Sequence, residues 1–152
     1  MNTKKTCASE LASFTWTDRA IWKRSAINTL WCLLGCVIGD FGTIYWFQVY
    51  HPQTSALIVM PIAMINGILT SIALETTLLS RQMALRAAFK TAVGMSLVSM
   101  VSMELAMNLV DLALVGEARL EWWAIPPMLI AGFLTPWPYN YWRLKKHGKA
   151  CH

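Results

Sequence analysis

The chain has 152 residues, of which 56% are hydrophobic and 14% charged, and its net charge is +5 at pH 7. An ordinary soluble domain has roughly 25% charged residues, and a domain of this size has too little interior to hide so much apolar surface. Together with a mean hydropathy of +0.44, this composition excludes an ordinary soluble domain and indicates an integral membrane protein.

Four long apolar stretches predict four transmembrane helices, at about residues 25–47, 56–79, 91–115 and 122–141. Each stretch is long enough to cross a hydrocarbon core of roughly 30 Å as a helix. We expect the first to be retained, because it is too long for the apolar region of a signal peptide. The connections are short, which makes neighbouring helices antiparallel. The sequence therefore predicts one all-α domain over residues 1–152, an integral membrane four-helix bundle with up-down topology.

The positive charges predict how this bundle is oriented. All 13 Lys and Arg residues except Arg119 fall before the first stretch, between the second and third, or after the fourth. This pattern argues against nucleic acid as a partner, and the positive-inside rule makes that side cytoplasmic. We expect a multi-pass protein of a bacterial inner membrane with both termini inside. The tails 1–18 and 143–152 would then be cytoplasmic.

Small residues predict where two helices meet. Gly35 and Gly39 are four residues apart in the first stretch, and Ala63, Gly67 and Ser71 follow the same spacing in the second. Such spacing lets helix backbones approach closely in a membrane. The contact could lie within one chain or between two copies of it.

The third stretch has a polar and sulfur-containing face. At about 100° per residue one side of this helix collects five side chains, with Met103 at its edge: Met100, Glu104, Met107, Asn108 and Asp111. Polar groups inside a membrane are costly and mark functional sites by default. This face is therefore the first candidate for a functional site.

Four carboxylates lie within the predicted spans, Asp40, Glu75, Glu104 and Asp111, and no Lys or Arg lies there. They must be protonated, hydrogen-bonded, hydrated or bound to a cation. By helical rise, Glu104 falls near mid-membrane, Asp40 and Asp111 in the outer half, and Glu75 toward the cytoplasm. As an alternative, Asp40 and Asp111 reach the outer interface, where a carboxylate costs little.

Sulfur-containing side chains suggest which cation would bind. Met103 and Met107 share one helical face, as do Met60 and Met64, and Cys36 lies at a similar depth. Thioether and thiolate ligands select Cu(I). We predict a metal site made by nine residues: Cys36, Asp40, Met103, Glu104, Met107, Asn108, Asp111, Cys151 and His152. Cys151 and His152 would act as a cytoplasmic donor or acceptor, and Cu(I) is the only cofactor expected. Alternatively, the methionines only fill the core.

The sequence contains no Gly-rich phosphate loop, His-Glu-x-x-His or Gly-x-Ser-x-Gly motif, so we do not expect an enzyme. The function predicted first is binding or transport of a soft metal ion, Cu(I). The alternative is a non-transporting scaffold or assembly subunit whose acidic face binds another membrane protein. Homo-oligomers are compatible with both hypotheses, and the bilayer is the expected environment.

Three motifs carry a resemblance to a known family: Gly35-Cys36-x2-Gly39-Asp40, Met103-Glu104-x2-Met107-Asn108-x2-Asp111 and Pro136-x-Pro138-Tyr139-Asn140-Tyr141-Trp142. From about Arg19 onward, the chain resembles a family of small bacterial membrane proteins known only as a domain of unknown function. The resemblance implies a helical bundle in the inner membrane and an association with copper handling. Read without the family, the third motif predicts a helix break at its prolines. It also predicts an interfacial aromatic anchor made by Trp137, Tyr139, Tyr141 and Trp142.

Overall fold

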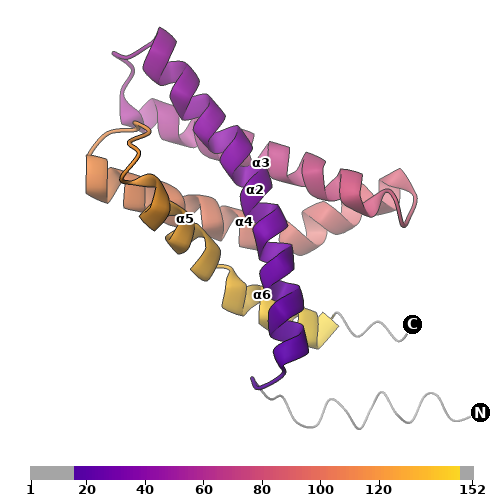
Figure 1. Ribbon diagram of the computed structural model, residues 1–152. Helices are drawn as coiled ribbons and strands as arrows, with labels where there is room; N and C mark the ends of the chain where they lie inside the picture. The colour runs from indigo at the N-terminus through magenta and orange to yellow at the C-terminus, as the bar shows by residue number, and fades with distance from the viewer. Residues whose placement is uncertain (1–15, 148–152) are drawn as a thin grey trace, which may run out of the picture.

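The computed structural model describes residues 16–147, apart from the side chains of Met95 and His147. Regular structure in this part of the chain is entirely helical, in agreement with the predicted all-α class (Figure 1). The helices, in chain order, are α2 (Arg19–Tyr50), α3 (Ala56–Leu79), α4 (Leu85–Val115), α5 (Ile125–Leu134) and α6 (Trp137–His147).

Three helical segments in the described residues are long and apolar enough to cross a membrane: Arg19–Tyr50, Ala56–Leu79 and Ser96–Val115. The first and third predicted stretches lie inside α2 and α4, and the second coincides with α3. Three of the four predicted stretches therefore correspond to apolar helices of spanning length. Helices α2 and α4 extend beyond the predicted stretches at their N-terminal ends, where polar and basic residues continue the helix.

The fourth stretch is not one continuous helix, so this part of the prediction is wrong. Helix α5 ends at Leu134, and α6 begins at Trp137. Pro136 has no backbone N–H to donate, and its ring clashes with the preceding turn, which interrupts a helix. The backbone of Asn140 then donates to the Pro136 carbonyl at 2.8 Å, which opens the new helix. The predicted helix break at these prolines is confirmed.

The predicted small-residue contact is confirmed, and it lies within one chain between α2 and α3. A Cβ atom on Gly35 would lie 2.5 Å from the Cα of Ser71. One on Gly39 would collide with the carbonyl of Asn66 and the hydroxyl of Thr70. The glycines therefore allow a backbone approach that any side chain would prevent.

Helix α6 is held against the first half of α2 by hydrogen bonds (Figure 1). The Asn140 side-chain amide donates to the Thr29 hydroxyl at 2.8 Å, and the Trp137 indole donates to the Ser25 hydroxyl at 3.1 Å. Ser25 and Thr29 are fully buried. These bonds fix the position and rotation of α6.

Aromatic rings complete the contact of α6 with α2. Tyr141 is fully buried, and its ring stacks on Trp22 at 4.2 Å and on Trp16 at 5.2 Å between centroids. The expectation that Tyr141 serves as a lipid-interface anchor is therefore wrong. The Pro-x-Pro-Tyr-Asn-Tyr-Trp motif instead joins α6 to α2.

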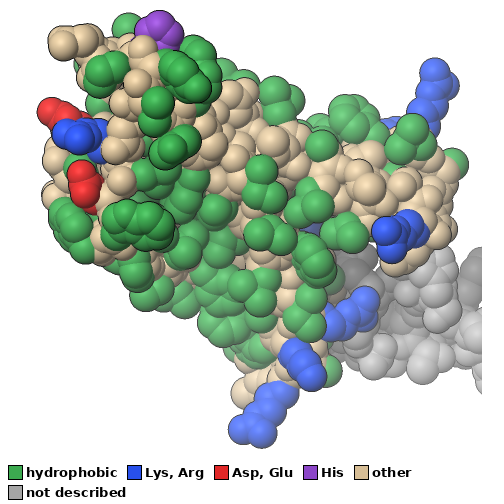
Figure 2. Space-filling view, turned by 45° about the horizontal axis from the view of Figure 1, so that its top comes forward, with side chains coloured by type: hydrophobic (Ala, Val, Ile, Leu, Met, Phe, Trp, Pro, Cys, Tyr) green, Lys and Arg blue, Asp and Glu red, His purple; other side chains and the backbone are tan. Residues whose placement is uncertain are grey.

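The surface separates charge from apolar area. Figure 2 shows hydrophobic side chains over the middle of the molecule, most of the Lys and Arg at one side, and the acidic side chains and His at the other. In Figure 1 the α3–α4 turn diverges from the start of α2 and from α6. At the basic side of the molecule, the ends of the helices therefore diverge from one another.

Candidate functional site

The predicted polar and sulfur-containing face of α4 is turned into the protein. Met100, Met103, Glu104, Met107 and Asp111 are all 0% exposed. Asn108, on the same face, is 4% exposed. The prediction that this stripe forms one face of a helix is confirmed, and Met103 is as deeply buried as its neighbours.

Helix α2 brings sulfur to the same place. Cys36 is fully buried and belongs to one compact group, here called the sulfur cluster, whose sulfur-bearing members are Cys32, Cys36, Met100, Met103 and Met107. Gly132 of α5 closes one side, since a Cβ atom there would lie 2.7 Å from the Met107 sulfur. The structure thus brings together three of the four sulfur-containing residues predicted for the metal site, Cys36, Met103 and Met107, and it adds Cys32 and Met100.

The Glu104 side chain enters the contact between α2 and α3. A Cβ atom on Gly67 would collide with the Glu104 carboxylate and lie 3.1 Å from the Cys36 carbonyl oxygen. Glu104 also interacts with the Cys36 thiol and with Asp40. Neither Glu104 carboxylate oxygen has a hydrogen-bond partner of good geometry among the described residues. An acidic side chain in such surroundings needs a proton or a cation.

An acidic and amide layer lies toward the α4 C-terminus. The Asn108 amide donates to Asp40 at 3.4 Å and to the Glu104 carbonyl at 3.0 Å. Asp40 also interacts with Asp111, whose two oxygens lack a partner in the described structure. Asp40 and Asp111 are fully buried, so the alternative in which they reach the outer interface is wrong.

The remaining candidate residues from the sequence are not shown at this site. Met60 and Met64 are half-buried on α3 and do not belong to the sulfur cluster. Cys151 and His152 lie outside the described residues. In residues 16–147 no group of three or more His, Cys, Asp or Glu side chains could hold a metal ion. A metal site here would therefore depend on thioether ligands.

The structure contains a buried cation that the charge pattern of the sequence does not predict. Arg143 of α6 is only 7% exposed, and its Nε and Nη1 have no hydrogen-bond partner in the described part of the chain. The side chain of Glu75 interacts electrostatically with this guanidinium. Counting charges had assigned Arg143 to a cytoplasmic tail. Its position three residues after Asn140, on the same helical face, was the available signal.

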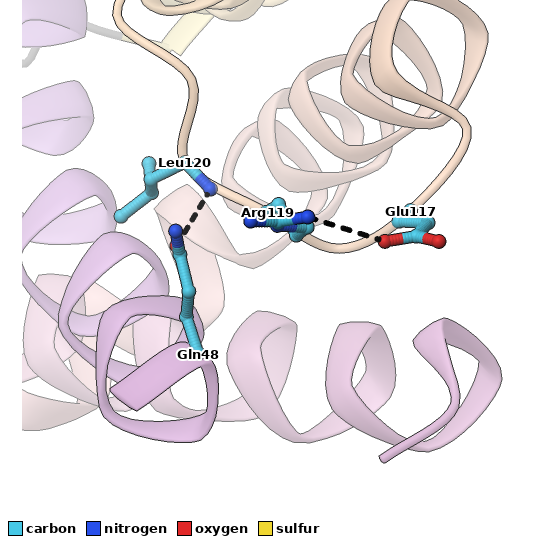
Figure 3. A network of polar contacts seen from close by, with 4 residues as sticks. All are labelled: Gln48, Glu117, Arg119 and Leu120. Atoms are coloured by element: carbon cyan, nitrogen blue, oxygen red, sulfur yellow. Dashed lines mark hydrogen bonds and ion pairs between the residues drawn. The ribbon is translucent and has the colours of Figure 1, made fainter. Parts of the chain in front are cut away.

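Two of the cavities in the described structure lie at opposite ends of the helices, and they are called outer and inner here after the orientation that the positive charges predict. The outer cavity, of about 620 Å³, is lined by the C-terminal ends of α2 and α4 and the start of α3. The connection between α4 and α5 borders this cavity and is held by Gln48, whose side-chain oxygen accepts from the Leu120 backbone N–H at 3.1 Å (Figure 3). Beside this bond lies an exposed ion pair between Arg119 and Glu117 at 3.9 Å. The inner cavity, of about 240 Å³, includes Glu75 and Arg143.

Three apolar helices of spanning length and a buried polar and sulfur-containing interior define the class as multi-pass α-helical membrane proteins. Within this class the chain belongs to the family described as Domain of unknown function (DUF4396), whose model matches residues 21–149. The expected membership of a family of unknown function is confirmed. No curated protein and no solved structure matches the chain.

Proposed function

We propose that this protein binds a soft metal ion, Cu(I), inside the membrane and moves it across. The observation that carries the proposal is the sulfur cluster, in which Cys36, Met103 and Met107 lie together beside the unpartnered carboxylate of Glu104. Thioethers and thiolates prefer Cu(I) to the hard cations that bind oxygen. A cation would also offset the cost of burying Glu104.

The acidic and amide layer gives this site a hydrophilic flank. Asp40, Asn108 and Asp111 extend from Glu104 toward the outer end of α4, where the outer cavity begins at Leu112. Their partly unpartnered oxygens would attract a cation entering from that side. Cys151 and His152 would exchange the ion on the cytoplasmic side.

The membrane arrangement belongs to the same proposal. Helix α5 rises only about 15 Å, half of a hydrocarbon core of roughly 30 Å, so α5 and α6 together would form a fourth, broken crossing. Both termini would face the cytoplasm of a bacterial inner membrane, in line with the distribution of Lys and Arg. We also propose that the protein is not an enzyme.

The scaffold hypothesis has less support. Asp40, Glu104 and Asp111 are 0% exposed, so basic residues of a partner helix would have no access to them without rearrangement of the chain. A homo-oligomer that leaves these residues inside each copy remains compatible with the metal proposal.

Metal analysis after anaerobic Cu(I) loading of the detergent-purified protein tests the proposal. We expect stoichiometric copper in the wild type and its loss in Met103→Leu/Met107→Leu, because Leu preserves volume at a cost of less than about 1.5 kcal/mol while removing both sulfur atoms. The matched control is Met60→Leu/Met64→Leu, on α3, which should retain copper. Absence of copper in the wild type, or full retention without Met103 and Met107, would reject the proposal.

A further inference from the structure

The inner cavity contains a buried positive charge and a negative charge that do not form an ion pair. Arg143 and Glu75 both line it, yet the ion pair found in the described part of the chain joins Arg119 to Glu117. Arg143 exposes 7% of its surface, and two of its three nitrogens lack a partner there. Arginine stays charged in proteins, and an unpaired buried cation costs several kcal/mol. Glu75 acts on Arg143 only from beyond ion-pair distance, so Nε and Nη1 of the guanidinium remain available to an anionic group.

The position of Arg143 is fixed before any ligand binds. Asn140, one helical turn earlier on α6, is tied to Thr29 at 2.8 Å, and Tyr141 is stacked against Trp22. A planar guanidinium held in this way presents parallel N–H donors, which suit phosphate and carboxylate groups.

The acidic side chain of Glu75 in the same cavity restricts the class of ligand that can bind at Arg143. A simple anion would be repelled by Glu75, whereas a zwitterion would satisfy both residues. The neutral polar groups Asn28, Gln82, Thr91 and Ser96 line the same space. At about 240 Å³ the cavity is smaller than most drug-sized sites, so it suits a headgroup rather than a large molecule.

The remaining wall is apolar and lies at the basic end of the bundle. Trp31, Leu78 and Leu79 line the cavity, and Trp31 is 44% exposed on the outer surface of α2. Leu78 and Leu79 end α3, next to the turn that carries Arg81, and Arg86 lies in the first turn of α4. A membrane places lipid headgroups at this depth, with acyl chains beside such a surface.

We propose that the inner cavity binds a phosphate–ammonium zwitterion, the headgroup of an aminophospholipid such as phosphatidylethanolamine, with its phosphate at Arg143 and its ammonium at Glu75. This function is separate from the metal proposal and does not depend on it. A free phosphoethanolamine has the same chemistry. The apolar wall favours the lipid.

Lipid retention by the full chain, measured by native mass spectrometry from detergent micelles, tests this proposal. We expect retention of phosphatidylethanolamine over phosphatidylcholine, whose trimethylated nitrogen cannot donate a hydrogen bond. Arg143→Gln should lower retention roughly tenfold, the loss expected for about 1.4 kcal/mol from one charge-assisted hydrogen bond. The exposed Arg86→Gln, at the same end of the molecule, is the matched control and should retain the lipid.

Two further arms keep the result decisive. Ala92 is 1% exposed and lines the cavity. Ala92→Leu should therefore block lipid binding sterically while the Arg143 charge remains. This variant tests the proposal even if Arg143→Gln does not fold. Competition with millimolar phosphoethanolamine distinguishes the soluble source from the lipid. Equal retention of both lipids by the wild type, or unchanged retention in Arg143→Gln and Ala92→Leu, would overturn the proposal. Copper binding would be unaffected by that outcome.

Discussion

The carboxylate of Glu104 on α4 occupies the space that a side chain at Gly67 on α3 would fill. This relationship places an acidic group inside the contact of three helices, beside the Cys36 carbonyl of α2. Because Gly67 has no side chain, α3 and α4 can approach each other with the Glu104 carboxylate between them. The candidate site therefore depends on Gly67 as much as on its own ligands.

Gly67→Ala should destabilise the fold and displace Glu104. The added methyl group collides with the carboxylate, and overpacking of this kind costs about 1–3 kcal/mol. The free energy of unfolding in micelles, from a denaturant titration, measures it. Gly94→Ala is the control, because a Cβ atom at Gly94 meets nothing within 4 Å. It should be neutral or stabilising by up to about 1 kcal/mol. Equal effects of the two substitutions would refute the steric argument.

Asn140 and Thr29 should be energetically coupled. Their 2.8 Å hydrogen bond is buried and joins α6 to α2. Asn140→Ala should cost about 1–3 kcal/mol, because the Thr29 hydroxyl oxygen then loses its donor. A double-mutant cycle with Thr29→Val should give a coupling energy of roughly 0.5–1.5 kcal/mol, within the range found for residues in contact. Strict additivity would show that the bond does not hold α6 in place.

The stability of the connection between α4 and α5 should depend on the hydrogen bond of Gln48 and not on the Arg119–Glu117 ion pair. Gln48→Met removes the acceptor of the Leu120 backbone N–H, a net loss of about 1 kcal/mol. Glu117→Gln breaks an exposed pair at 3.9 Å, and such pairs contribute at most about 1 kcal/mol. Unfolding titrations of the two variants should therefore rank Gln48→Met as the more destabilising. The reverse order would contradict the role assigned to Gln48 (Figure 3).

Thiol labelling should report the proposed orientation. In a Cys7→Ser/Cys151→Ser background, Cys32 and Cys36 are 2% and 0% exposed and should not react with a membrane-impermeant maleimide. Gln53→Cys, in the exposed α2–α3 loop, should react in intact cells, whereas Ser80→Cys, at the other end of α3, should react only after lysis. Labelling of Ser80→Cys in intact cells would reverse the orientation.

The apolar parts of three helices and their buried faces could be predicted from the sequence because they depend on hydropathy and local periodicity. The α4 stripe from Met100 to Asp111 is buried as its spacing indicated. The contact at Gly35 and Gly39 followed from small-residue spacing, although its place within one chain did not. The prolines at 136 and 138 predict the break, although the apolar length of residues 122–141 predicts one span.

Amino-acid sequence alone determined that this is a membrane protein with apolar helices and a buried polar face, since hydropathy and helical period are properties of neighbouring residues. Tertiary structure decided which groups meet. Glu104 reaches the α2–α3 contact because Gly67 leaves room for it. Arg143, which charge counting placed in a cytoplasmic tail, is buried because Asn140 and Tyr141 bind α6 to α2. Both outcomes depend on contacts between residues far apart in the chain, which hydropathy and helical period do not determine.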